Sequence, residues 1–276
     1  MNVLFVFALP FILSGMLAIG IRAVAGEERG ARLAGVAVVL GFLVPWSLSL
    51  TPGWIPSDSL GRIGHIAGGA AMVGFVLDYF GFARLWAAIA AGVVVIVSTW
   101  ASLNNGLSTD TQVSLTMALF LVLYSGLAFL LLAKLNSMRD RPAGLIVTVI
   151  MIGLAIVVQS AVVGDLDILK TGFILVVAVL AYSAVCAFVL VIFGYAFVLG
   201  TGSVLLSAAW ALAERAPSTL IALLLLPLML FAEGTAKHIK LPDARISSYL
   251  YPLVLAGVAA LPLGLGAVIT FVMYGP

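Results

Sequence analysis

The stretch TGFILVVAVLAYSAVCAFVLVIFGYAFVLGTGSVLLSAAWALA, residues 171–213, contains no charged side chain and decides how the chain is divided. As a single helix it would be about 65 Å long, roughly twice the thickness of the hydrocarbon core of a bilayer. We therefore expect two membrane spans, at 172–193 and 195–213, that turn back on one another at Gly194. The motif Gly200-Thr201-Gly202 marks a further candidate break, or a re-entrant turn, inside the second of these spans.

The rest of the sequence has the same apolar character. Apolar residues make up 64% of the 276 residues and charged residues only 9%, whereas a soluble domain carries about 25% charged residues. We expect one all-α, polytopic integral membrane domain over residues 1–276, with no soluble domain. Proline predicts kinks in the last two spans, at Pro227 and Pro262. The ten predicted spans are residues 3–21, 33–50, 63–80, 85–103, 113–133, 143–163, 172–193, 195–213, 218–232 and 249–273.

The basic residues fall mainly in alternate loops. With ten spans and an outside N-terminus, the outer loops keep only Arg62, Lys170 and Arg215. Positive residues collect on the cytoplasmic side of a membrane, so this pattern favours ten spans with both termini outside. We expect the location to be a bacterial cytoplasmic membrane. The inner loops hold ten of the thirteen basic residues, namely Arg22, Arg29, Arg32, Arg84, Lys134, Arg139, Arg141, Lys237, Lys240 and Arg245.

Two ionisable side chains, His65 and Asp78, lie within the third predicted span. They are about 20 Å apart along a helix and so cannot contact each other. An ionisable residue inside a span is a candidate functional residue by default. The structural alternative for Asp78 is an ion pair with Arg84 across the tight turn that follows the span.

Uncharged polar side chains gather at the outer ends of the fourth and sixth predicted spans. As candidate substrate-binding residues they are Ser98, Thr99, Ser102, Asn104 and Gln159. Together they would line one shallow outer cavity that binds a polar solute. The alternative is that they hydrogen-bond between helices and cap helix ends.

Thr201 and Ser203 complete the set of candidate binding residues, because they stand among the glycines of the candidate break. A helix unwound at such a point exposes backbone groups to a solute or an ion. The pair Thr171-Gly172 is a second candidate break. The alternative is an ordinary turn, which needs the same residue types.

Small residues recur at four-residue spacing in three predicted spans. Examples are Gly64 with Gly68, Ala70 with Gly74, Ala88 with Gly92, and the run Ala256, Ala260 and Gly264. This spacing lets two helix backbones approach closely. We expect the contacts to lie within this chain, with an interface to other subunits as the alternative.

Catalytic and cofactor motifs do not occur in the sequence. It contains no zinc-protease, phosphate-loop or serine-hydrolase motif. The two histidines, His65 and His238, fall on opposite sides of the predicted topology, and Cys186 is the single cysteine. We therefore expect no enzyme activity, no metal and no cofactor.

Two functional hypotheses remain. The first is a transporter or permease for a small neutral or apolar solute, favoured by the glycine breaks, the kinked spans and the polar clusters. The second is a non-catalytic structural or assembly subunit of a larger membrane complex, favoured by the small-residue faces. The expected partners are the lipid bilayer and other membrane subunits; we expect no nucleic acid.

Overall fold

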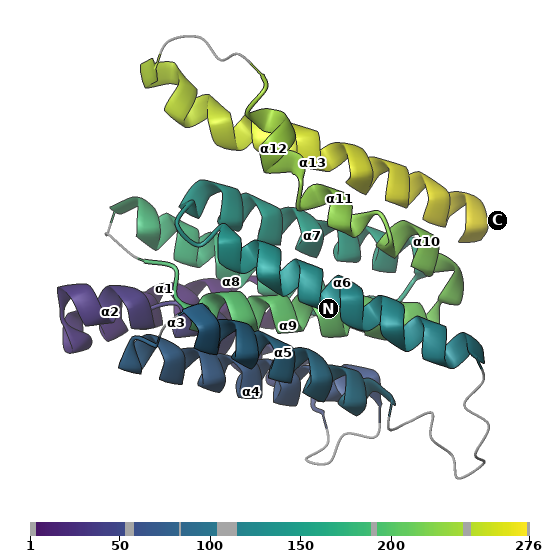
Figure 1. Ribbon diagram of the computed structural model, residues 1–276, viewed down its shortest axis with the longest axis horizontal. Helices are drawn as coiled ribbons and strands as arrows, with labels where there is room; N and C mark the ends of the chain where they lie inside the picture. Colours follow the sequence, from purple (N-terminus) through teal and green to yellow (C-terminus); the bar gives the residue numbers. More distant parts are fainter. Residues whose placement is uncertain are drawn as a thin grey trace.

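The computed structural model describes residues 4–52, 58–82, 84–103, 115–188, 192–239 and 244–274. Within these residues the chain is helical and contains no strand. The helices lie side by side along the long axis of the molecule, with α4 and α5 on one side and α13 on the other (Figure 1). The elements are η1 (Leu4–Ala8), α1 (Leu9–Ala25), α2 (Glu27–Leu33), α3 (Val36–Leu50), α4 (Ser59–Phe80), α5 (Arg84–Leu103), α6 (Leu115–Ser137), α7 (Pro142–Val163), α8 (Leu166–Phe188), α9 (Tyr195–Arg215), η2 (Pro217–Thr219), α10 (Leu220–Leu223), α11 (Leu226–Met229), α12 (Ala232–Ala236) and α13 (Ala244–Tyr274).

Six of the described helices are long and apolar enough to cross a membrane, and the count is seven if the bent pair α2–α3 forms one span. The bend between α2 and α3 is 42°. Three of the ten predicted spans coincide with shorter apolar helices, at Leu85–Thr99, Val122–Ser137 and Pro217–Met229. The structure therefore supports an all-helical protein with six to seven candidate spanning helices.

The predicted division of residues 171–213 is confirmed, because α8 ends at Phe188 and α9 begins at Tyr195. The predicted break at Gly200-Thr201-Gly202 is wrong, since α9 is continuous through it. The hydroxyl of Thr201 donates to the Phe197 carbonyl at 2.7 Å, a bond that stays within the helix. These glycines serve packing, because a Cβ on Gly202 would lie 2.5 Å from Leu132.

The second predicted break, at Thr171-Gly172, is also wrong. Both residues lie inside α8, where the Thr171 hydroxyl donates to the Asp167 carbonyl at 2.8 Å. A Cβ on Gly172 would lie 2.6 Å from Val157 of α7, so this glycine too serves close packing.

The two prolines that were predicted to kink helices, Pro227 and Pro262, have different effects in the structure. The helix is interrupted around Pro227, whereas Pro262 lies within the continuous α13.

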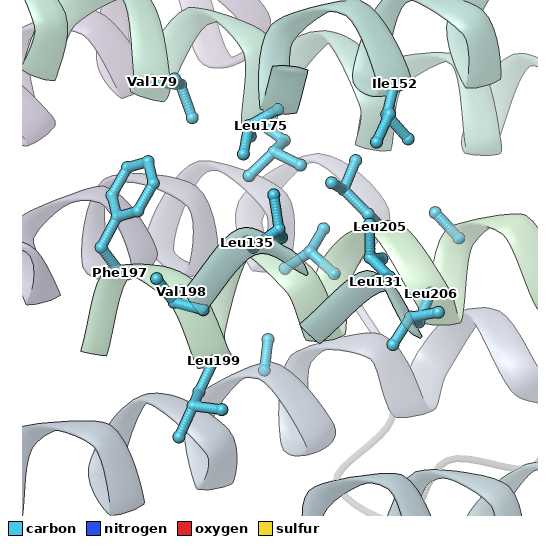
Figure 2. Packing of buried hydrophobic residues seen from close by; sticks show 14 of the residues in the cluster. Leu131, Leu135, Ile152, Leu175, Val179, Phe197, Val198, Leu199, Leu205 and Leu206 are labelled. Atoms are coloured by element: carbon cyan, nitrogen blue, oxygen red, sulfur yellow. The ribbon is translucent and has the colours of Figure 1, made fainter. Parts of the chain in front are cut away.

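Helix α9 is the central element of the bundle. It contacts each of α3 to α8 and also α10. Every residue from Gly194 to Ala208 is buried. Side chains of α6, α7 and α8, among them Leu135, Ile152 and Leu175, pack toward it (Figure 2). The fold is therefore a layer of helices around one buried, uncharged helix.

The most extensive helix pair is α4 with α9. The two backbones meet at Gly74, where an added Cβ would lie 2.5 Å from the Cα and the nitrogen of Ala196. A side chain at position 74 would push the two helices apart. The neighbouring small residue Gly69 has open space around it, with no atom within 4 Å of an added Cβ.

We predict that Gly74→Ala destabilises the protein, because the new methyl group overlaps the α9 backbone and overpacking costs about 1–3 kcal/mol. Gly69→Ala on the same helix is the control, and it should leave stability unchanged or raise it slightly, since alanine favours helix over glycine. The measurement is the midpoint of thermal unfolding in detergent. Equal midpoints for the two variants would contradict the close approach of α4 and α9.

Candidate functional site

Asp78 caps the start of α9. Its side chain is 9% exposed, and its two carboxylate oxygens accept the backbone N–H groups of Tyr195 at 2.8 Å and Ala196 at 2.9 Å. The first N–H groups of a helix lack partners within the helix and carry its positive dipole end. The N-cap residue, Gly194, has no side chain with which to satisfy them. Asp78 therefore supplies the cap from another helix.

Two arginines, Arg139 and Arg32, contact the residues at the start of α9. The guanidinium of Arg139 lies 4.1 Å from the centre of the Tyr195 ring, a cation–π contact. The carbonyl oxygen of Arg32 would lie 2.6 Å from a Cβ on Gly194, so only glycine fits there. The predicted pair of Asp78 with Arg84 stays a prediction, because the side chain of Arg84 lies outside the described residues. The described partners of the carboxylate are the two N–H groups of α9.

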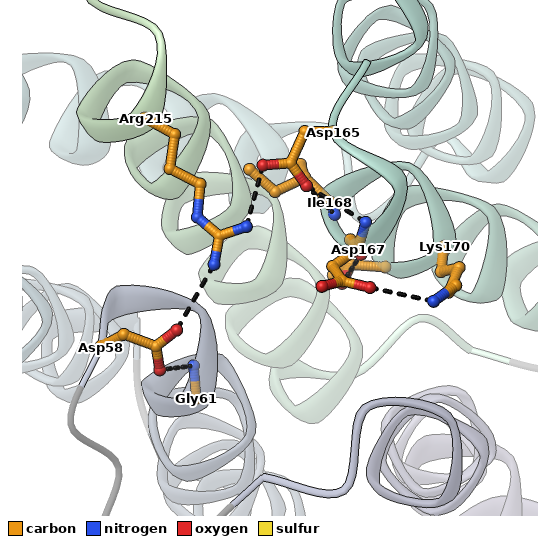
Figure 3. Close-up of polar contacts among 8 residues, drawn as sticks. Asp58, Gly61, Asp165, Asp167, Ile168, Lys170 and Arg215 are labelled. Carbon is orange, nitrogen blue, oxygen red and sulfur yellow. Dashed lines mark hydrogen bonds and ion pairs between the residues drawn. The ribbon is translucent and has the colours of Figure 1, made fainter. Parts of the chain in front are cut away.

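A second ionic group joins three helix ends on the opposite side of the bundle (Figure 3). Arg215, at the end of α9, donates to Asp165 at 2.8 Å and to Asp58 at 3.4 Å. Asp58 caps α4 through the N–H of Gly61 at 3.0 Å, and Asp165 caps α8 through the N–H of Ile168 at 3.0 Å. One guanidinium thus ties the starts of α4 and α8 to the end of α9.

The pKa of Asp165 reflects these contacts. Partial burial acts to raise it, but the N–H of Ile168 and the guanidinium of Arg215 outweigh that effect and hold the pKa below its ordinary value. The carboxylate is therefore charged at neutral pH and available to the ion pair.

A third ionic group lies at the other end of the bundle. Glu233 of α12 is 4% exposed and pairs with Arg141 at 2.7 Å and with Lys237 at 3.0 Å. Burial acts to raise the pKa of Glu233, but these two cations hold it below its ordinary value. The group ties α12 to the start of α7. His238 is exposed beside it, with Nδ1 2.8 Å from the Gly234 carbonyl.

The predicted polar residues lie at separate helix interfaces. Thr99 of α5 pairs with Ser125 of α6, with 3.4 Å between the hydroxyl oxygens. Gln159 of α7 is buried, and its amide lies against Gly266 of α13. The contact of Thr99 with Ser125 agrees with the alternative reading, hydrogen bonding between helices. That these residues bind a solute stays a prediction.

The remaining predicted residues are engaged locally or lie apart. Ser98 and Ser203 are buried, and their hydroxyls donate to Val95 at 3.0 Å and Leu199 at 2.6 Å on their own helices. His65 is exposed on α4. The side chain of Ser102 and all of Asn104 lie outside the described residues.

The structure contains an apolar cavity of about 150 Å³ beside α9. Leu123 and Leu224, at its edge, are 55% and 49% exposed, so it reaches the surface between α6 and α10. An apolar cavity of this size stays free of water and accepts small hydrocarbons. Its wall is made of Leu123, Tyr124, Leu127, Leu131, Ile152, Leu205, Leu206, Ala209, Trp210, Ala213, Leu220, Leu223, Leu224, Leu226, Pro227 and Leu230.

Two aromatic residues, Tyr124 and Trp210, belong to this wall, and the polar atoms of both side chains are buried. The rings of Tyr124 and Trp210 meet edge to face, with 4.8 Å between their centres. Sequence reasoning missed the cavity because apolar residues of α6, α7, α9 and the segment 220–230 build it together, and no single segment carries a signal for it.

The sequence matches no protein-family model and no curated protein. The function therefore has to be inferred from the cavity, the ionic groups and the helix arrangement.

We predict that Asp78→Ala lowers the free energy of unfolding by about 2 kcal/mol or more, because it removes two charge-assisted hydrogen bonds from a buried helix end. The free energy of unfolding of Asp78→Asn should lie between those of Asp78→Ala and the wild type, since the amide oxygen of asparagine retains one acceptor. The measurement is unfolding by sodium dodecyl sulfate in mixed micelles, followed by circular dichroism.

Asp58→Ala is the matched control, because Asp58 caps α4 through a single N–H at a solvent-exposed position. Removal of this cap should lower the free energy of unfolding by about 1 kcal/mol or less. If Asp78→Ala lowers the free energy of unfolding by no more than Asp58→Ala does, Asp78 is not the anchor of α9.

Proposed function

We propose that this protein is a membrane carrier that binds a small apolar solute in the cavity beside α9. The observation that carries the proposal is the cavity itself, about 150 Å³ in volume and lined by leucine, isoleucine, alanine and two aromatic residues. A void deprives its lining of dispersion contacts, so an apolar molecule that fills it restores those contacts. No lining residue carries a charge, which disfavours an ionic solute.

The part of the wall formed by α10, α11 and the turns that follow them supports a carrier because it is irregular. Leu225, Leu228 and Phe231 donate to carbonyls three residues earlier, at 3.0–3.1 Å, instead of continuing an α-helical ladder. Pro227 lacks the N–H that the ladder needs and its ring obstructs the preceding turn. Short helical pieces linked by turns can change their relative angle at lower cost than a continuous helix. This wall is the element that would open and close the cavity.

For the membrane arrangement we propose ten spans with both termini outside. The six to seven candidate spanning helices are joined by α5, α6 and the α10–α12 segment, which run alongside them (Figure 1). The group around Glu233, Arg141 and Lys237 would then face the inner side, and the group around Arg215, Asp58 and Asp165 the outer side. The excess of basic residues at the first end supports this orientation.

We predict that cysteines at Ser137 and Leu166 react from opposite sides of the membrane, because α7 separates them. Both positions are exposed, and Cys186→Ser removes the single native cysteine. A membrane-impermeant maleimide added to intact cells should label the Leu166→Cys variant, and the Ser137→Cys variant only after lysis. Labelling of both variants in intact cells would contradict the ten-span topology.

We predict that Ala209→Phe abolishes binding of an apolar probe, because the added ring fills the cavity. The measurement is saturable binding of isopropylbenzene to protein in lipid nanodiscs, with the free probe determined by headspace gas chromatography and empty nanodiscs subtracted. Ala88→Phe is the control, since Ala88 is exposed on α5 and does not line the cavity. It should bind the probe as the wild type does. Absence of saturable binding by the wild type would refute the proposed carrier site.

A second candidate function, a subunit of a larger membrane complex, is favoured by glycines that this chain leaves unpacked. Gly92 of α5 and Gly264 of α13 have no atom of the described part of the chain within 4 Å of an added Cβ. By contrast, Gly74 and Gly64 of α4 are used inside the chain, against Ala196 and Trp46. Open glycines on outward faces suit close approach by another helix. Partners that co-purify in fixed stoichiometry in mild detergent would favour this second function.

A further inference from the structure

Two accessible cations at one end of the bundle bind the same oxygen of a buried carboxylate. Nη1 of Arg141 lies 2.7 Å from Oε1 of Glu233 and Nζ of Lys237 lies 3.0 Å from it, so the two cations are neighbours. The side chain of Arg141 is 57% exposed and that of Lys237 is 47% exposed. A guanidinium has five N–H donors and an ammonium has three, whereas each contact with Glu233 uses one nitrogen. The pair can therefore bind a further anion without releasing Glu233.

This end of the bundle also carries more positive than negative charge. Glu233 neutralises only one of the two cations that it binds. A phosphate group presents several oxygens and can accept hydrogen bonds from both cations at once. The segments that meet here, residues 134–141 and 232–237, contain four cations, Lys134, Arg139, Arg141 and Lys237, and two carboxylates, Asp140 and Glu233.

Exposed apolar side chains lie beside these cations. Phe231 and Ile239, on either side of α12, are 51% and 44% exposed, and Nζ of Lys134 lies 5.4 Å from the centre of the Phe231 ring. Arg141 is the N-cap residue of α7, which is long and apolar enough to cross a membrane. A residue at the start of a spanning helix lies at the depth of the lipid headgroups. The surface thus combines cations for a headgroup with apolar side chains for acyl chains.

We propose that Arg141 and Lys237 together bind the phosphate of an anionic phospholipid, and that Glu233 holds the two cations in place for it. Basic sites between membrane helices select anionic lipids through such contacts. A zwitterionic lipid is disfavoured, because its own cation competes with Arg141 and Lys237 for the phosphate. Neither residue lines the cavity beside α9, so this inference does not depend on the proposed carrier.

Two phospholipids with identical acyl chains separate the effect of charge from general lipid binding. Phosphatidylglycerol is anionic, whereas phosphatidylcholine is zwitterionic. Binding of each lipid to the full chain in detergent is measured by native mass spectrometry, which counts the lipid molecules bound to each protein. The quantity compared between variants is the ratio of the two dissociation constants for the first bound lipid, in which the shared acyl-chain contacts cancel.

The wild-type protein should favour phosphatidylglycerol, and Lys237→Gln should reduce this preference about fivefold, since one cation is lost. Arg141 still pairs with Glu233 in that variant, so the buried carboxylate keeps a partner. Lys237→Arg should retain the wild-type preference. Arg29→Gln is the matched control, because it removes one exposed cation from α2, which lies on the other side of the bundle from α12 (Figure 1). It should leave the ratio unchanged.

Three results would overturn the inference. The first is a wild-type protein that binds both lipids equally well. The second is an equal loss of preference in Lys237→Gln and Arg29→Gln, which would reflect net charge and no particular site. The third is displacement of bound phosphatidylglycerol by an equal concentration of inorganic phosphate, which would make the ligand a free anion. If Lys237→Gln folds poorly, Lys237→Met keeps the unbranched stem without the charge and must show the same loss.

Discussion

The fold depends on the contact between the Asp78 carboxylate and the first N–H groups of α9. Helix α9 is buried on all sides, so water cannot satisfy the unpaired groups at its start. A carboxylate is the strongest available partner for them, because it accepts both N–H groups and opposes the positive end of the helix dipole. The same contact sets how α4 lies against α9, since Gly74 lies one helical turn before Asp78.

Charged side chains hold both ends of α9 in place. Asp78 anchors one end of α9, and Arg215 anchors the other through Asp165 and Asp58. Between these ends α9 contains no charged residue from Tyr195 to Ala213. Burial of an uncharged helix among equally apolar neighbours does not by itself fix its position, because each apolar face can pack against any other. Close glycine contacts and charged helix ends therefore have to supply its position.

Features of the fold that depend on a single segment could be predicted from the sequence, whereas contacts between residues far apart along the chain could not. The division at Gly194 follows from length alone, because no bilayer accommodates a helix of about 65 Å. The continuity of α9 through Gly200 and Gly202 could not be predicted, since glycine suits both a break and a close contact, and Val39 and Leu132 decide between them. Asp78 was identified as a candidate, but its partners, Tyr195 and Ala196, lie too far along the chain for any local pattern to reveal them.

The cavity lies between a straight helix on one side and an interrupted helical segment on the other. The rigid wall is α9, held at both ends and packed against α3 to α8. The opposite wall, α10 and α11, is interrupted near Pro227 and leads into α12, which the ion pair of Glu233 with Arg141 ties to α7. Interrupted helical pieces pack less completely against a straight helix than a continuous helix does, and the space left between them is the cavity. Under the proposed function, binding and release of a solute would both depend on this interrupted wall of α10 and α11.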